Sequence, residues 1–307
     1  MAGTETGPPP GKSYSGGSVS APAASDLIKL RRFPLGGGER TSQPAGLLPP
    51  TIPDLPWWAY ALLFAAGLVA GGVDAIAGGG GLITLPVLLG LGLPAPLALG
   101  TNKLGSVFGT FSATWSFARR GAVNLRECLP GLGLTACGAA LGALAVRQID
   151  SNLLGRVIPW LLAAIVGYFA FRPQLGDTDR HHRLGETSFY LLFGLGLGFY
   201  DGFFGPGTGS FWTIAFILLL GHNFVKAAAH TKAMNLASNA AALIVFAAGG
   251  TVLLWPGLAL GAGQLLGARF GAHLALTRGA RFVRPVFLLM ASLVALKLIY
   301  ASLTRGQ

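Results

Sequence analysis

The residues of this sequence best suited to chemistry lie around two glycine-rich breaks in apolar segments. In the first, Asp74 precedes Gly78–Gly81, and Lys103 follows after a short apolar stretch. Such a break leaves backbone groups without helical partners, and a helix that restarts after it directs free N–H groups and partial positive charge toward the break. A helix end of this kind, with an ammonium group nearby, favours an anion.

The same order of residues occurs a second time. Asp201 precedes a break that runs from Gly205 to Gly209, and Lys232 follows a second short apolar stretch. The acid and the lysine are 29 residues apart in the first copy and 31 in the second. We interpret the two copies as an internal repeat. Broken helices at matching positions of two halves are typical of transporter binding sites, although glycines can also serve only close helix packing.

We therefore predict one central anion site built from both copies. Backbone donors at the breaks, the two lysines, and nearby hydroxyl and amide side chains would bind the anion. Ser106 and Ser238 extend the same polar surface. The candidate substrate-binding residues are Gly78, Gly79, Gly80, Gly81, Thr101, Asn102, Lys103, Gly205, Gly207, Thr208, Gly209, Thr231, Lys232, Asn235 and Asn239.

The charged residues of the two motifs each allow a second interpretation. A lysine in an apolar segment is costly unless it is paired or hydrated, and the alternative is a side chain that reaches back to the membrane surface. Asp74 and Asp201 could take up a proton during transport. They could equally be salt-bridge partners or caps that hold the broken backbone, and their positions favour neither role.

The composition indicates a membrane as the surroundings of these motifs. The chain has 307 residues, of which 52% are hydrophobic and only 11% are charged, whereas about 25% are charged in a typical soluble domain. A helix needs about 20 apolar residues to cross the hydrocarbon core. We predict an all-α, polytopic membrane protein with two short segments after the breaks, 82–93 and 210–221. The full spans are predicted at 57–77, 96–118, 127–147, 152–171, 187–204, 227–248, 252–275 and 283–302.

Three parts follow one another along the chain. Residues 1–50 are rich in Gly, Pro and Ser and are predicted to be a disordered tail. Residues 57–172 would form the first transmembrane repeat and residues 186–303 the second. If the short segments cross the membrane, there are ten crossings and the halves are inverted. If they are re-entrant, there are eight, and the basic residues of the loops favour neither topology.

Several classes of function are disfavoured. The net charge of +11 comes from basic residues scattered through short loops, which fits the positive-inside rule better than nucleic-acid binding. The sequence contains no G-x-S-x-G, H-E-x-x-H or P-loop motif, and its two cysteines match no zinc or redox spacing. We expect no enzyme activity, cofactor, metal or nucleic-acid partner. The expected partners are a small anion and the lipid bilayer, and the oligomeric state stays open.

The motifs resemble those of the sulfite exporter TauE/SafE family, which belongs with the toluene sulfonate uptake permeases. The likeness extends over about residues 57–302. It is strongest in the two break motifs and a closing segment, at residues 74–86, 98–103, 201–210, 232–239, 267–271 and 278–284. The resemblance implies a multi-pass permease of the bacterial inner membrane for sulfite, sulfonates or related organosulfur anions, driven by the proton gradient.

Two other functions remain as alternatives. A passive anion channel would use the same site but would need no titrating acid. A structural membrane protein without transport activity would need neither lysine inside the bilayer.

Overall fold

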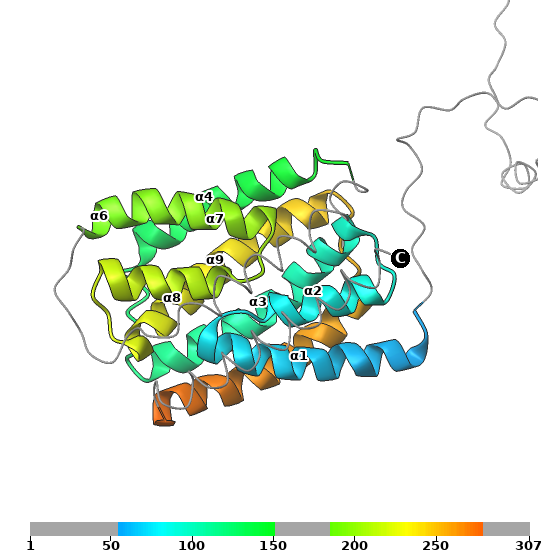
Figure 1. Cartoon of the computed structure of the whole chain (residues 1–307), viewed down its shortest axis with the longest axis horizontal. Helices are drawn as coiled ribbons and strands as arrows, with labels where there is room; N and C mark the ends of the chain where they lie inside the picture. Colours follow the sequence, from blue (N-terminus) through cyan, green and yellow to red (C-terminus); the bar gives the residue numbers. More distant parts are fainter. Residues whose placement is uncertain (1–54, 151–184, 279–307) are drawn as a thin grey trace, which may run out of the picture. The chain divides into compact units, whose positions relative to one another are not determined.

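The computed structural model describes residues 55–150 and 185–278 (Figure 1). Both ranges belong to one unit of the chain, Pro50–Gln307. Within them every regular element is helical and no strand occurs, so the predicted all-α class is confirmed for this part of the chain. The tail 1–50 and the segments predicted at 152–171 and 283–302 lie outside the described residues.

The first break divides a long helix from a short one. Helix α1 (Trp57–Ala77) starts after Pro56 and ends at the break, and α2 (Gly81–Gly90) restarts the helical path. Two long helices follow, α3 (Ala95–Arg119) and α4 (Leu129–Val146). Both carry proline in their first turn, where the missing N–H costs no helical hydrogen bond.

The second break is preceded by three consecutive helical elements. These are α6 (Glu186–Phe189), the π-helical turn η2 (Tyr190–Gly194) and α7 (Leu195–Phe203). The short helix α8 (Thr208–Leu219) follows the break. Helix α9 (Phe224–Ala248) is capped by the side chain of Asn223, which accepts from the Lys226 N–H at 3.0 Å. Residues 254–278 form a further helix.

The helix lengths fit the predicted mixture of spans and short segments. Among the described residues, α1 and α4 are long and apolar enough to cross a membrane by length and composition. Helices α2 and α8, with 10 and 12 residues, are about 15 and 18 Å long. That is roughly half of a hydrocarbon core of about 30 Å. The predicted number of crossings and the division into two halves remain predictions.

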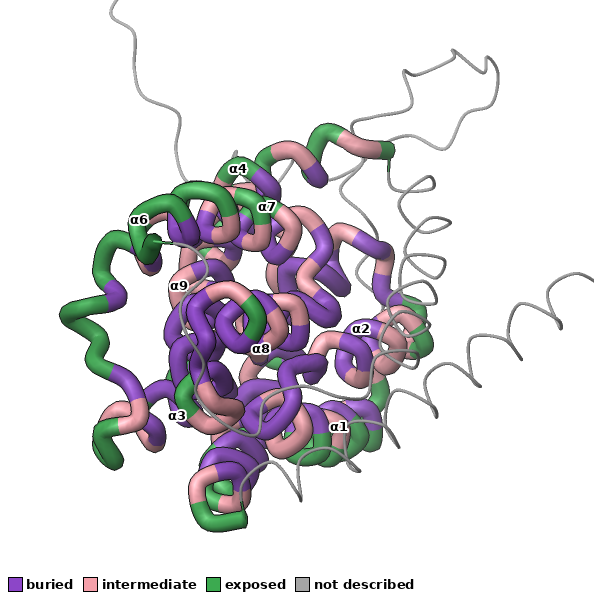
Figure 2. The backbone as a smooth tube through the Cα atoms, turned by 60° about the vertical axis from the view of Figure 1, so that its left-hand side comes forward, coloured by how far each residue is buried: buried purple, intermediate pink, exposed green. Residues whose placement is uncertain are grey.

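Burial separates the polar residues of the motifs from the apolar residues of the outer surface. Much of α3, α8 and α9 is buried (Figure 2), including their polar residues. Large apolar side chains such as Leu141, Ile244 and Phe270 are exposed instead. An exterior of this kind suits lipid better than water.

Glycine permits close approach of the helices around the site. Gly67 and Gly71 of α1 lie against the backbone of the 254–278 helix, at Leu260 and Gln264. At Gly142 of α4, an added methyl group would lie only 2.7 Å from the Phe203 nitrogen of α7. Small residues at such crossings let backbones meet in a membrane, where helices gain no hydrophobic drive from one another.

The α4–α7 crossing gives a first testable prediction. Gly142→Ala should lower the thermal unfolding temperature of the detergent-purified protein, because the new methyl group forces α7 away. Gly133→Ala, on the same helix but with no atom of the described residues within 4 Å of the added carbon, is the matched control. It should leave that temperature unchanged or raise it, since alanine favours helix over glycine by about 0.5–1 kcal/mol. Equal effects of the two substitutions would contradict the crossing.

Candidate functional site

The two glycine-rich breaks lie directly against each other. Gly78 has a φ of +69°, which favours glycine, and its Cα faces Gly209 so closely that a methyl group there would lie 2.7 Å from the Gly209 Cα. Ser210, in the first turn of α8, donates hydrogen bonds to the carbonyl oxygens of Ala77, at 2.9 Å, and Gly78. The end of α1 is thereby fastened to the start of α8.

Asp74 accepts hydrogen bonds from the backbone N–H groups of the first break. Its Oδ1 accepts from the backbone N–H groups of Gly79 and Gly80, at 3.0 and 3.1 Å. Its Oδ2 accepts from Lys232 Nζ at 2.8 Å. Two backbone donors that we predicted to bind an anion thus bind a carboxylate of the chain itself.

Asp201 has a comparable but different set of partners. Its Oδ1 accepts from Lys103 Nζ at 2.8 Å and from Thr208 Oγ1 at 3.3 Å, and Ser238 Oγ donates to its Oδ2. Lys103 Nζ also donates to Asn239 Oδ1 at 3.0 Å. Asp201 therefore binds side chains, whereas Asp74 binds backbone as well.

Each lysine is paired with the aspartate of the other motif. Lys103, Asp201 and Lys232 are buried and Asp74 is partly buried: the exposed fractions are 2% and 4% for Lys103 and Asp201, and 1% and 17% for Lys232 and Asp74. Pairing offsets the cost of placing an ammonium group away from water. The alternative, lysines that reach the membrane surface, does not describe these two side chains. The aspartates adopt the salt-bridge geometry, and Asp74 also caps the backbone.

A hydroxyl contact joins each short helix to the long helix that follows it. Thr84 of α2 donates to the Asn102 side chain of α3. In the second copy, the hydroxyl groups of Thr213 in α8 and Thr231 in α9 lie 3.1 Å apart. The same kind of contact therefore holds both short helices in place beside the site.

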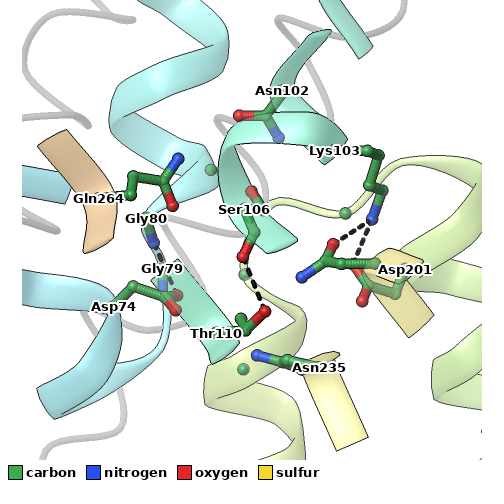
Figure 3. A pocket seen from close by; sticks show the side chains of 15 residues that line it. Asp74, Gly79, Gly80, Asn102, Lys103, Ser106, Thr110, Asp201, Asn235 and Gln264 are labelled. Carbon is green, nitrogen blue, oxygen red and sulfur yellow. Dashed lines mark hydrogen bonds and ion pairs between the residues drawn. The ribbon is translucent and has the colours of Figure 1, made fainter. Parts of the chain in front are cut away.

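A small polar cavity lies between the motifs (Figure 3). Its volume is about 30 Å³, which leaves room for about two water molecules. All of the lining residues are polar, charged or glycine. The residues among them that the sequence predicted are Asp74, Gly79, Gly80, Gly81, Asn102, Lys103, Asp201, Gly205, Gly207, Gly209, Asn235 and Asn239.

Five other predicted residues do not line the cavity. Thr101 Oγ1 accepts from the Leu253 N–H at 3.0 Å, and so holds the start of the last described helix. The other four take part in the contacts at the breaks and between the helices that are described above. They are Gly78, Thr208, Thr231 and Lys232.

The structure adds three residues to the predicted lining: Ser106, Thr110 and Gln264. Ser106 and Thr110 follow Lys103 by three and seven positions, so they lie on the same face of α3, and this spacing is readable in the sequence. We had placed Ser106 on the polar surface but not in the site. Gln264 comes from the 254–278 helix, outside both motifs. Its signal is an amide with apolar residues on both sides, at 256–263 and 265–268.

The Lys103–Asp201 pair gives a second prediction. Lys103→Met and Asp201→Asn should each lower the free energy of unfolding by about 3–5 kcal/mol, because each leaves a buried charge without its partner. The double variant should lose less than the sum of the two. Chemical unfolding in detergent measures this, and Lys226→Met, at an exposed lysine of α9, should change little. Strictly additive losses would show that the two charges do not support one another.

Comparison with known proteins identifies the family. A family model described as sulfite exporter TauE/SafE matches residues 63–298. No solved structure shows a significant match.

Relatives in several bacteria are similar over most of the chain. A "probable membrane transporter protein" of Haemophilus influenzae is 48% identical over 240 residues, which are 78% of this chain and 94% of that protein. The "probable membrane transporter protein ORF9" of a Sinorhizobium species is 46% identical over 80% of this chain and 94% of its own. The protein YfcA of Escherichia coli K12, with the same description, is 41% identical over 78% and 90%. These descriptions name transporters and no enzyme, and the chain belongs to the sulfite exporter TauE/SafE family.

Proposed function

We propose that this protein is a proton-coupled secondary transporter of small anions, a multi-pass protein of the bacterial inner membrane. Sulfite, sulfonates and related organosulfur anions are the candidate substrates. One observation carries the proposal. At one polar cavity, the lysine of each motif forms an ion pair with the aspartate of the other motif. The family and the descriptions of the relatives support it.

An anion in the cavity would meet Lys103. This lysine lines the cavity, whereas Lys232 does not line it and binds Asp74. Two acceptors hold the Lys103 ammonium group at present, Asp201 and Asn239. A substrate oxygen would compete with Asp201 for this cation, since both are anionic acceptors.

Displacement of Asp201 would couple anion binding to a proton. A buried carboxylate that loses its cation is costly and is neutralised by binding a proton. The two lysines and two aspartates sum to zero charge, and one monoanion bound together with one proton leaves that sum unchanged. Asp74 would keep Lys232 and its two backbone donors, so the first break would stay closed.

Transport would require the site to widen. The present volume of about 30 Å³ is too small for an anion of several heavy atoms. The contacts Thr84–Asn102 and Thr213–Thr231 hold each short helix to its own long helix. Each short helix would then move with its long helix, as in alternating access, while the contacts between the motifs, such as Lys103–Asp201, open.

Uptake into proteoliposomes tests the proposal and is our third prediction. Radiolabelled sulfite and a simple alkyl sulfonate are offered with and without an imposed pH gradient. We expect accumulation of at least one anion above equilibrium only with the gradient, because a proton accompanies the anion. Equilibration that ignores the gradient would indicate a passive channel instead, and no flux of either anion would overturn the proposal.

Variants in the same vesicles test the role of Lys103. Lys103→Ala should abolish uptake while the protein is still present in the membrane, because the anion loses its cation. Lys226→Ala removes an exposed lysine from α9 and should leave uptake near the wild-type rate. Normal flux in a well-expressed Lys103→Ala protein would contradict the assignment.

A further inference from the structure

Gln264 lines the cavity, and the hydrogen bonds of its side-chain amide are incomplete among the described residues. The residue is only 3% exposed, and its Nε2 has no hydrogen-bond partner among the residues that the structure describes. It lies on the side of the cavity opposite Lys103 and Asp201 (Figure 3). Buried polar atoms in proteins nearly always have a partner, so each exception calls for one.

The surroundings of Gln264 hold its amide in this position. An added methyl group at Gly109 of α3 would lie 2.7 Å from Gln264 Oε1, and one at Gly105 would lie 3.1 Å from Nε2. Gly71 of α1 lies against the Gln264 backbone, where a methyl group would be 2.7 Å from its Cα. Three glycines on two helices thus leave a space shaped for this side chain, and larger residues there would displace it.

A second amide in the same wall is also incomplete. Asn235 of α9 is 5% exposed, lines the cavity, and its Oδ1 has no partner within the described residues. One unused donor and one unused acceptor therefore belong to residues that line one small space from two helices. Gln264 would be satisfied by an acceptor oxygen and Asn235 by an O–H group, which a singly protonated oxyanion carries together, and neither by an apolar occupant.

The rest of the lining also disfavours an apolar group. It consists of glycines and of carboxylate, ammonium, amide and hydroxyl side chains, with no aliphatic or aromatic side chain among the described residues that line the cavity. Sites that bind organic ligands usually present mainly hydrophobic and aromatic surface. An alkyl or aryl substituent would gain no apolar contact here, and it would cover polar groups that then lack partners.

We propose that Gln264 is a substrate-binding residue that selects compact inorganic oxyanions. In the widened site, one oxygen of the anion would accept from Gln264 Nε2 and another from Lys103 Nζ. Sulfonates with alkyl or aryl groups bind poorly at the same site. This inference rests on the proposed anion transport and adds to it the class of substrate.

The test uses the full-length protein in proteoliposomes with radiolabelled sulfite. Gln264→Met, which keeps the length of the side chain but has no amide, should raise the KM for sulfite about tenfold or more, since hydrogen bonds to charged groups are strong. Gln148→Met, at an exposed glutamine after α4, is the matched control and should leave KM unchanged. An unchanged KM in Gln264→Met would overturn the role of this residue while sulfite transport itself still stood.

Competition on the wild-type protein needs no variant and tests the substrate class. Unlabelled benzenesulfonate and methanesulfonate should inhibit sulfite uptake at least about tenfold more weakly than unlabelled sulfite does, a difference that corresponds to about one lost hydrogen bond. Equal inhibition by benzenesulfonate would overturn the proposed selectivity without affecting the transport proposal. If the wild-type protein transports no sulfite at all, both the role of Gln264 and the selection of compact inorganic oxyanions are overturned.

Discussion

Each buried lysine of this protein has its counterion in the other motif, and the rest of the site depends on this exchange. Lys103 and Asp201 are 98 residues apart in the chain, Lys232 and Asp74 are 158 apart, and both pairs close at 2.8 Å. Each motif has an aspartate of its own, yet each lysine pairs with the aspartate of the other motif, and no buried charge among these four is left unpaired. The exchange therefore requires the two breaks to meet, and the contact between Gly78 and Gly209 is the consequence.

The two pairs differ in what else they hold. One oxygen of Asp74 accepts from two backbone N–H groups, so this pair also fixes the backbone at the first break. Asp201 is held by side chains, and its lysine lines the cavity. A pair held by side chains can open without unfolding a helix end. We infer that structural stability and substrate binding are divided between two pairs that look equivalent in the sequence.

Much of this arrangement is predictable from the sequence, because apolar length and glycine breaks act locally. The predicted segments 57–77 and 96–118 correspond to Trp57–Ala77 and Ala95–Arg119, and the two short helices follow the breaks as expected. Pairing between the motifs was not predictable, since it depends on contacts far apart in the chain. The threonines beside the lysines were assigned to the site by proximity. Successive residues of a helix point about 100° apart, so Thr101 and Thr231 face neighbouring helices instead.

The most direct test of the central claim is whether the anion replaces Asp201 at Lys103. Infrared difference spectra of the reconstituted protein, recorded with and without sulfite, would show whether a carboxyl group becomes protonated on binding. We predict that a protonated-carboxyl band appears with sulfite, is lost in Asp201→Asn and persists in Asp74→Asn. A sulfite-bound protein with no such band, or with a band that vanishes only in Asp74→Asn, would contradict the account.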